Sequence, residues 1–161
     1  MNTRKFYLLS FILSLLLIVA AYYLQYAQGL KPCALCSLQR MVYYVIAMLS
    51  LLAVCTDPQR MWQRIMAAVL SLTALIGLVI ASRHVWLQFF PPSDVGCGPD
   101  LNFMLQNFPL SEVIKTLFYG SGYCALVTWR FLGLSIADWS MLFFGGFLVL
   151  FLYLLVRKKD P

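Results

Sequence analysis

Charged side chains are scarce in this sequence, making up 11% of its 161 residues, whereas an ordinary soluble domain contains roughly 25%. Apolar residues account for 62%, against roughly 45–50% in soluble domains, and they occur in long uninterrupted runs. These proportions exclude a water-soluble globular fold. The sequence also lacks a basic stripe with interleaved aromatic residues, so its net charge of +6 does not indicate nucleic-acid binding.

Four apolar runs are long enough to form transmembrane helices, which need about 20 residues each. The predicted spans are residues 6–24, 35–54, 65–82 and 139–156. The second span has to begin near Leu35, because the strongly apolar part of this run is too short to cross a bilayer alone. We therefore expect an all-α integral membrane protein, in which residues 1–161 form a single domain folded as a four-transmembrane-helix bundle.

The first span is interpreted as a signal anchor rather than a cleaved secretory signal. Its apolar stretch is longer than the core of a signal peptide, and no clean small-residue cleavage site follows it.

Basic residues are distributed unevenly between the two ends of these spans. Two precede the first span, two lie in the loop 55–64 and three follow the last span, all on one side of a four-span arrangement. Basic residues on the other side are spread over much longer loops. Because short basic flanks mark the cytoplasmic side, we expect both termini in the cytoplasm and the loops 25–34 and 83–138 on the outward, periplasmic side.

The loop 83–138 is too long to be a simple connection. Its apolar residues recur with a helical period at Leu110, Val113, Ile114, Leu117 and Phe118. This pattern predicts a short amphipathic helix, either lying on the membrane surface or packed on the ends of the spans. The proline- and glycine-rich segment 91–99 is expected to be irregular and able to extend Cys97, and Gly120-Ser121-Gly122 gives similar freedom just before Cys124.

Four of the five cysteines, Cys33, Cys36, Cys97 and Cys124, fall on the predicted outward side. In an oxidising compartment they could form two disulfides, and a C-x-x-C pair makes a short bridge that exchanges readily. The helix that begins at this pair favours the thiolate, the nucleophilic form, through its unpaired N–H groups and its dipole. Arg40, one helical turn beyond Cys36, adds a fixed positive charge that could stabilise a thiolate or a reduced, anionic acceptor.

Each of these residues also has a simpler interpretation. The cysteines could bind zinc, although zinc sites usually use two closely spaced pairs, or they could be inert staples. Arg40 could be an interfacial anchor. His84, the only histidine, could be an interfacial polar residue, although its depth would also let it donate a hydrogen bond to the same acceptor as Arg40.

Two further features lie outside the predicted site. Cys55 is expected to be a buried thiol at the cytoplasmic end of the second span. The pair Gly145-Gly146 is expected to permit close helix packing.

The segment from Pro32 to Arg40 (PCALCSLQR), the single His84 before a long outward loop, and the Cys97/Cys124 pair resemble the disulfide bond formation protein B (DsbB) family. The segment from Trp129 to Leu134 that leads to Trp139 is similar to that family's approach to its last span. The resemblance covers essentially the whole chain, although Cys55 and Arg83 lie outside the family pattern.

The resemblance implies a bacterial inner-membrane enzyme that reoxidises the periplasmic thiol oxidase DsbA and transfers the electrons to membrane quinone, ubiquinone or menaquinone. By position, Cys97 is the cysteine attacked by reduced DsbA, and Cys124 is its disulfide partner. Cys33 and Cys36 are the quinone-proximal pair, with Cys36 forming the thiolate contact to the quinone. Arg40 is implied to hold the quinone and His84 to assist at its carbonyl oxygen.

Alternative functions remain open at the level of the sequence. A paralogue serving another thiol oxidase would have nearly the same sequence, and a non-enzymatic tetraspan scaffold would share the stapled loops. A vitamin K epoxide reductase-like enzyme is disfavoured, since its C-x-x-C pair is expected near a later span. The resting disulfide pattern also stays open, because four cysteines allow three pairings.

Overall fold

The computed structural model describes residues 3–29, 32–56, 60–91, 106–109, 111–112 and 129–157. Within them lie the long helices α1 (Thr3–Ala27), α2 (Ala34–Cys55), α3 (Arg60–Phe89) and α7 (Ile136–Val156), together with the short strands β1 (Arg130–Phe131) and β2 (Leu134–Ser135). All four helices are long and apolar enough to cross a membrane, so the expected all-α fold with four spans is confirmed.

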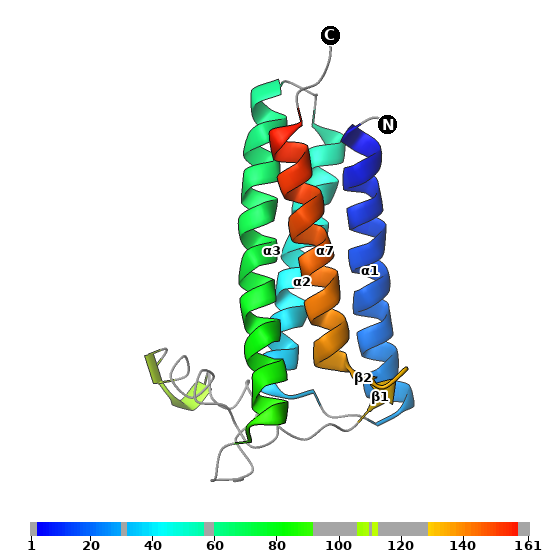
Figure 1. The fold of residues 1–161 in the computed structure, drawn as a ribbon, viewed down its shortest axis with the longest axis vertical. Helices are drawn as coiled ribbons and strands as arrows, with labels where there is room; N and C mark the ends of the chain where they lie inside the picture. Colours follow the sequence, from blue (N-terminus) through cyan, green and yellow to red (C-terminus); the bar gives the residue numbers. More distant parts are fainter. Residues whose placement is uncertain are drawn as a thin grey trace.

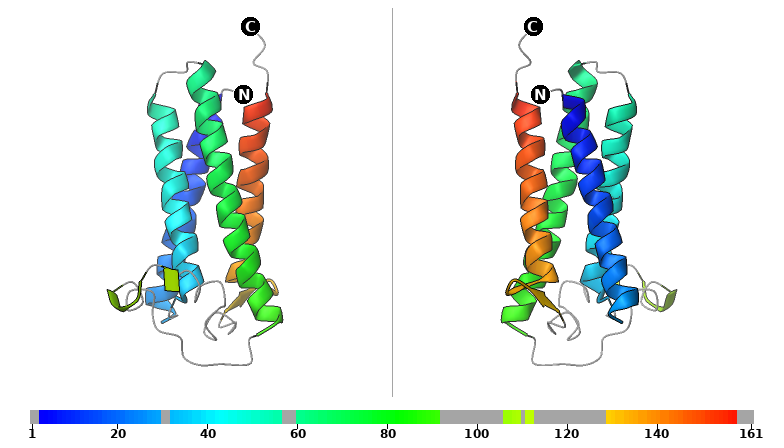
Figure 2. Two further views of the ribbon diagram at one scale, coloured as in Figure 1. Left: turned by 90° about the vertical axis from the view of Figure 1, so that its left-hand side faces the viewer. Right: turned by 90° about the vertical axis from the view of Figure 1, so that its right-hand side faces the viewer.

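The four helices run side by side as an elongated bundle (Figure 1). In it α2 packs against α1 and α3, and α3 packs against α7. The beginning of α1 and the end of α7 lie at one end of the bundle (Figure 2). The beginning of α2, the end of α3 and the β1–β2 hairpin lie at the other end, which we call the cysteine end.

Small side chains on α3 form the centre of the bundle. Ala67, Ala74 and Ala81 are completely buried and seven residues apart. Leu70 and Gly77, also buried, lie between them on the same face. This heptad spacing lets neighbouring helices approach α3 closely. The next position of the same repeat is residue 84. His84 therefore lies on this buried face of α3, at the cysteine end of the bundle.

Gly77 is the glycine that the close packing requires. A Cβ atom built there would lie 2.5 Å from the ring of Phe144 on α7, which also stacks on Tyr43 of α2 with ring centroids 4.3 Å apart. The role expected for Gly145 and Gly146 is wrong, because a Cβ at either position would meet open space. The buried face of α7 includes the rings of Phe144, Phe147 and Phe151, and Phe144 fills the space that Gly77 leaves on α3.

A hairpin that the sequence analysis missed leads into α7. Leu132 and Gly133 both have positive φ angles, 53° and 82°, as a two-residue type I′ hairpin turn requires. Ser135 then caps α7: its hydroxyl accepts a hydrogen bond from the Asp138 N–H, and the Asp138 carboxylate accepts one from the Ser135 N–H. The Ser135 hydroxyl also lies 2.8 Å from Oε1 of Gln88, which fixes the start of α7 against the end of α3.

Several predictions fall on other parts of the chain. Cys97 and Cys124 lie outside the described residues, as do most of the residues of the expected amphipathic helix 110–118. These remain predictions.

Candidate functional site

The C-x-x-C pair lies at the N-terminus of α2, as expected. Cys33 is the N-cap residue, and its sulfur accepts a hydrogen bond from the backbone N–H of Cys36 at 3.4 Å. The two Sγ atoms are 3.2 Å apart, in hydrogen-bond contact. Because N–H groups and the positive end of the helix dipole face this sulfur, the position favours a thiolate.

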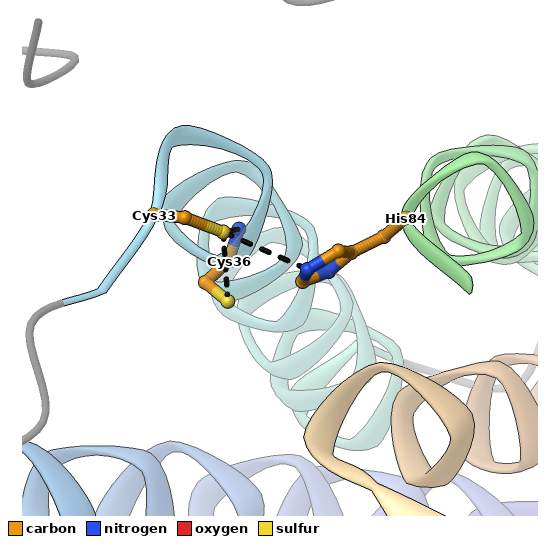
Figure 3. Close-up of side chains that lie close together, drawn as sticks. All are labelled: Cys33, Cys36 and His84. Carbon is orange, nitrogen blue, oxygen red and sulfur yellow. Dashed lines mark hydrogen bonds between the residues drawn. The ribbon is translucent and has the colours of Figure 1, made fainter. Parts of the chain in front are cut away.

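His84 reaches the cysteine pair from the neighbouring helix. Its side chain is 3% exposed, and its Nε2 atom lies 3.7 Å from Cys33 Sγ (Figure 3). Its other ring nitrogen, Nδ1, lies 3.4 Å from Nε2 of Gln39, which is 2% exposed. An amide nitrogen can only donate, so with this orientation Nδ1 is the acceptor. A neutral imidazole then carries its proton on Nε2, facing the sulfur.

An apolar cluster lies beside the pair. Leu35 of α2 and Leu87 of α3 are almost fully buried, and Cys33, Leu38 and Ile80 pack against them. Both cysteine residues are partly buried.

Arg40 is held by three groups of α1. Its guanidinium donates hydrogen bonds to the side chain of Gln25 and, at 3.0 Å, to the carbonyl oxygen of Ala21. It also lies over the ring of Tyr22, 5.0 Å from the ring centroid. All three of these partners on α1 are neutral, so none of them cancels the positive charge of Arg40.

A cavity of about 360 Å³ lies at the cysteine end between α1, α2 and α7. Small-molecule sites typically have volumes of about 300–1,000 Å³. Its walls are largely apolar and aromatic, with contributions from Leu17, Leu24, Trp129, Phe131, Trp139 and Phe143. Its polar lining comes from Cys36, Gln39, Arg40, Gln25 and Ser140.

The cavity is lined by one member of the cysteine pair. Cys36 and Arg40 both line the cavity, as their spacing of one helical turn predicts. Among the described residues, Cys33 and His84 are not part of this lining. Cys36 lines the cavity and contacts Cys33, whose sulfur in turn lies 3.7 Å from Nε2 of His84.

The structure brings together four of the predicted site residues, Cys33, Cys36, Arg40 and His84, and places Cys55 apart from them. Cys55 is the last residue of α2, at the opposite end of the bundle, and its side chain is exposed. The expectation that it is buried is wrong. Its neighbours Ala53 and Val54 face the core, whereas Cys55 lies on the outer face of the last turn of the helix.

Sequence reasoning missed Gln39 and Gln25, which contact the two predicted binding residues His84 and Arg40. A signal existed for Gln39, because it is a polar residue within an apolar span and lies one turn beyond Cys36. Gln25, at the end of the first span, had no such signal, since its partner comes from another helix.

Comparison with known proteins supports the resemblance to the DsbB family that the sequence indicated. Residues 3–154 match the family described as Disulfide bond formation protein DsbB. The chain is 38% identical over 158 residues to "Disulfide bond formation protein B" of Azoarcus sp. (strain BH72), covering 98% of this chain and 95% of the relative. It is 41% identical over 158 residues to the protein of the same name from Aromatoleum aromaticum, with the same coverage.

A third relative, from Marinobacter nauticus, is 39% identical over 162 residues, covering 100% of this chain and 96% of the relative. The family match, the near-complete coverage of these relatives and the four apolar helices all point to the same family. The chain is therefore a multi-pass membrane protein that belongs to the disulfide bond formation protein B family.

Proposed function

We propose that this protein reoxidises a DsbA-like periplasmic thiol oxidase by disulfide exchange and transfers the electrons to a membrane quinone. The observation that carries the proposal is that Cys36, one member of an exchangeable C-x-x-C pair, lines an apolar cavity together with the positive charge of Arg40. Quinones dissolve in lipid, so a site that reduces them must combine a redox-active sulfur with apolar walls inside a membrane bundle.

The proposed relay consists of two disulfide exchanges. The reduced thiol oxidase attacks a Cys97–Cys124 disulfide at Cys97 and leaves as a disulfide, which converts Cys97 and Cys124 to thiols. These two thiols then reduce a Cys33–Cys36 disulfide and regain their own bridge. The Cys33 and Cys36 thiols give two electrons and two protons to the quinone, and the Cys33–Cys36 disulfide forms again.

The residues around the cavity suit a quinone. A quinone supplies an acceptor for two electrons and two protons, and its reduced form carries oxygens that can be anionic. The guanidinium of Arg40 provides a cation and hydrogen-bond donors for such an oxygen. The aromatic side chains of Trp129, Trp139 and Phe143 provide flat apolar surfaces for a planar ring.

His84 and Gln39 act on the sulfur pair in this proposal. With Nδ1 occupied by Gln39, the Nε2–H of His84 can donate a hydrogen bond to Cys33 Sγ. Such a bond stabilises the Cys33 thiolate, and with it the reduced state of the pair. In this proposal His84 therefore assists at the sulfur rather than at the carbonyl oxygen of the quinone, which the resemblance implied.

The proposed setting is the bacterial inner membrane. The end of the bundle that contains the beginning of α1, the end of α7 and their basic flanks faces the cytoplasm. The cysteine end faces the periplasm. This orientation brings Cys33 and Cys36 to the oxidising side, where a soluble thiol oxidase works. An impermeant maleimide that labelled residues 33 and 97 from opposite faces of the bilayer would contradict it.

Turnover with purified components tests the function. The full chain in detergent is mixed with reduced DsbA and a soluble quinone analogue, and the quinone absorbance is followed. We expect quinone loss that needs both the reduced protein and this chain, with one quinone consumed per disulfide formed. If reduced DsbA is not oxidised under these conditions, the proposed function is wrong.

Arg40→Ala is expected to raise the apparent KM for the quinone by about 10- to 100-fold, because a charge-assisted hydrogen bond contributes about 1.5–3 kcal/mol. The exchange of thiols with DsbA, measured in a single turnover without quinone, should change little. Arg40→Lys keeps the charge but loses the planar pair of donors, so its KM for the quinone should lie between those of the parent and of Arg40→Ala. An unchanged KM in Arg40→Ala would remove Arg40 from the site.

A further inference from the structure

Three soft ligand groups meet at the cysteine end. The Sγ atoms of Cys33 and Cys36 and a ring nitrogen of His84 all lie within 4.8 Å of one another. They come from two helices, the N-terminus of α2 and the end of α3, and converge from both sides (Figure 3). Thiolate sulfur and imidazole nitrogen are the ligands that zinc prefers.

We propose that the reduced form of this protein binds one Zn²⁺ ion through Cys33, Cys36 and His84, and that the ion blocks reoxidation of the pair. Three protein ligands with an open fourth position form the usual arrangement of non-structural zinc sites, and a Cys₂His set is one of its forms. Both cysteines are partly exposed, and a water molecule would complete the coordination as the fourth ligand.

Two of the three distances between the ligand atoms are close to those of a tetrahedral zinc site, and the third, between Cys36 Sγ and the ring of His84, is within 4.8 Å. Zn–S bonds of about 2.3 Å and Zn–N bonds of about 2.0–2.1 Å place two sulfurs about 3.8 Å apart, and a sulfur and a nitrogen about 3.6 Å apart. The structure has 3.2 Å between the sulfurs and 3.7 Å between Cys33 Sγ and His84 Nε2. The sulfurs need to separate by about half an ångström, which a small side-chain rotation provides.

Gln39 supplies the outer contact that such a site needs. A histidine that binds zinc through Nε2 carries its proton on Nδ1 and donates it to a neighbouring acceptor. Nδ1 of His84 already faces the buried amide of Gln39. A half-turn of this amide exchanges its nitrogen for its oxygen, which then accepts the Nδ1–H.

Zinc and the disulfide exclude each other. Binding converts two thiols into two zinc-bound thiolates and releases two protons, whereas the disulfide has no thiolate to offer. The ion therefore stabilises the reduced pair against oxidation. It also occupies Cys36, the sulfur that lines the cavity, so a quinone there no longer meets a reactive thiolate.

The test uses the full-length chain with Cys55, Cys97 and Cys124 replaced by serine, so that only one pair of thiols remains. The protein is reduced and kept without oxygen in detergent, and Zn²⁺ is titrated against a chromophoric chelator. We expect one zinc ion per reduced chain and none per chain with the Cys33–Cys36 disulfide. Co²⁺ in place of Zn²⁺ should give the visible absorption bands of a tetrahedral site with thiolate ligands.

Substitutions of the remaining ligands decide the assignment. His84→Ala should weaken zinc binding and change the Co²⁺ spectrum, and Gln39→Leu should weaken binding by about 10- to 100-fold. Gln25→Leu is the matched control, since it makes the same chemical change at the same end of the bundle without contacting His84. Its zinc affinity should equal that of the parent.

Two results would overturn the proposal: zinc affinity unchanged in Cys36→Ser, or unchanged in His84→Ala. The readout is metal binding rather than turnover, so it is independent of the proposed quinone reaction. If turnover fails while zinc binds the reduced pair, only the proposed function is wrong. If turnover proceeds and zinc does not bind, only the metal site is wrong.

Discussion

Replacing Cys36 with serine is expected to lower steady-state quinone reduction by about 10³-fold or more, the scale of loss found when a catalytic nucleophile is removed. A serine hydroxyl cannot form a disulfide, and at neutral pH it is not ionised, so no electron pair reaches the cavity. The substitution exchanges one sulfur for one oxygen. The fold around the half-buried position should therefore persist.

A second measurement shows whether Cys36→Ser has lost only electron transfer to the quinone or its folded structure as well. In Cys36→Ser the proposed Cys97–Cys124 disulfide is intact, so each chain should still oxidise about one equivalent of reduced DsbA without consuming quinone. The reaction should then stop. Quinone loss at the parent rate would show that Cys36 does not pass electrons to the quinone.

Cys55→Ser provides the matched control. It makes the same substitution on the same helix, at an exposed position at the opposite end of the bundle. No step of the proposed relay uses Cys55, so turnover should equal that of the parent. If both serine variants lost activity equally, the loss would reflect general damage rather than a role for the cavity sulfur.

The backbone framework could be predicted well from the sequence because it depends on local patterns. Each of the four predicted spans lies within one helix, and the start of α2 at the cysteine pair follows from the length that a span requires. The shared face of Cys36 and Arg40 follows from helical periodicity. The helix α3, however, extends well beyond its predicted span 65–82, since hydropathy detects only the apolar part of a helix and not the polar turns that continue it.

The contacts of the site could not be predicted in the same way, because they join residues far apart in the sequence. Gln39 and His84 are 45 positions apart, and their contact depends on how α2 packs on α3. A heptad reading of α3 would have placed His84 on the same buried face as Ala74, Gly77 and Ala81. The interpretation of Gly145-Gly146 failed for a related reason: a glycine matters for packing only where a neighbouring helix supplies a large side chain, as Phe144 does at Gly77.

The hairpin before α7 illustrates a different limit. Its turn places Leu132, a non-glycine residue, at a positive φ, although hairpin turns of this type favour Asn or Asp at that position. No local signal therefore indicated it. One of its contacts comes from α7, where the Trp139 indole donates a hydrogen bond to the carbonyl oxygen of Phe131 at 3.2 Å.

Replacing Cys124 with serine is expected to trap a covalent complex between this protein and DsbA through Cys97. The variant is incubated with the disulfide form of DsbA, whose potential of about −120 mV marks a bridge that opens easily. The Cys97 thiolate attacks this bridge, so one sulfur of DsbA becomes bound to Cys97 and the other becomes a thiol. In the parent, Cys124 attacks the mixed disulfide and releases DsbA, but in the variant only the second thiol of DsbA can reverse the reaction.

The complex should therefore persist after acid quenching and alkylation, and run on a non-reducing gel at the summed mass of the two proteins. Dithiothreitol should abolish it, and Cys97→Ser combined with Cys124→Ser should fail to form it. Mass spectrometry of the linked peptides identifies the attacking sulfur. A link through Cys33 instead of Cys97 would reverse the proposed order, since DsbA would then exchange directly with the pair beside the cavity and the loop cysteines would not carry its electrons.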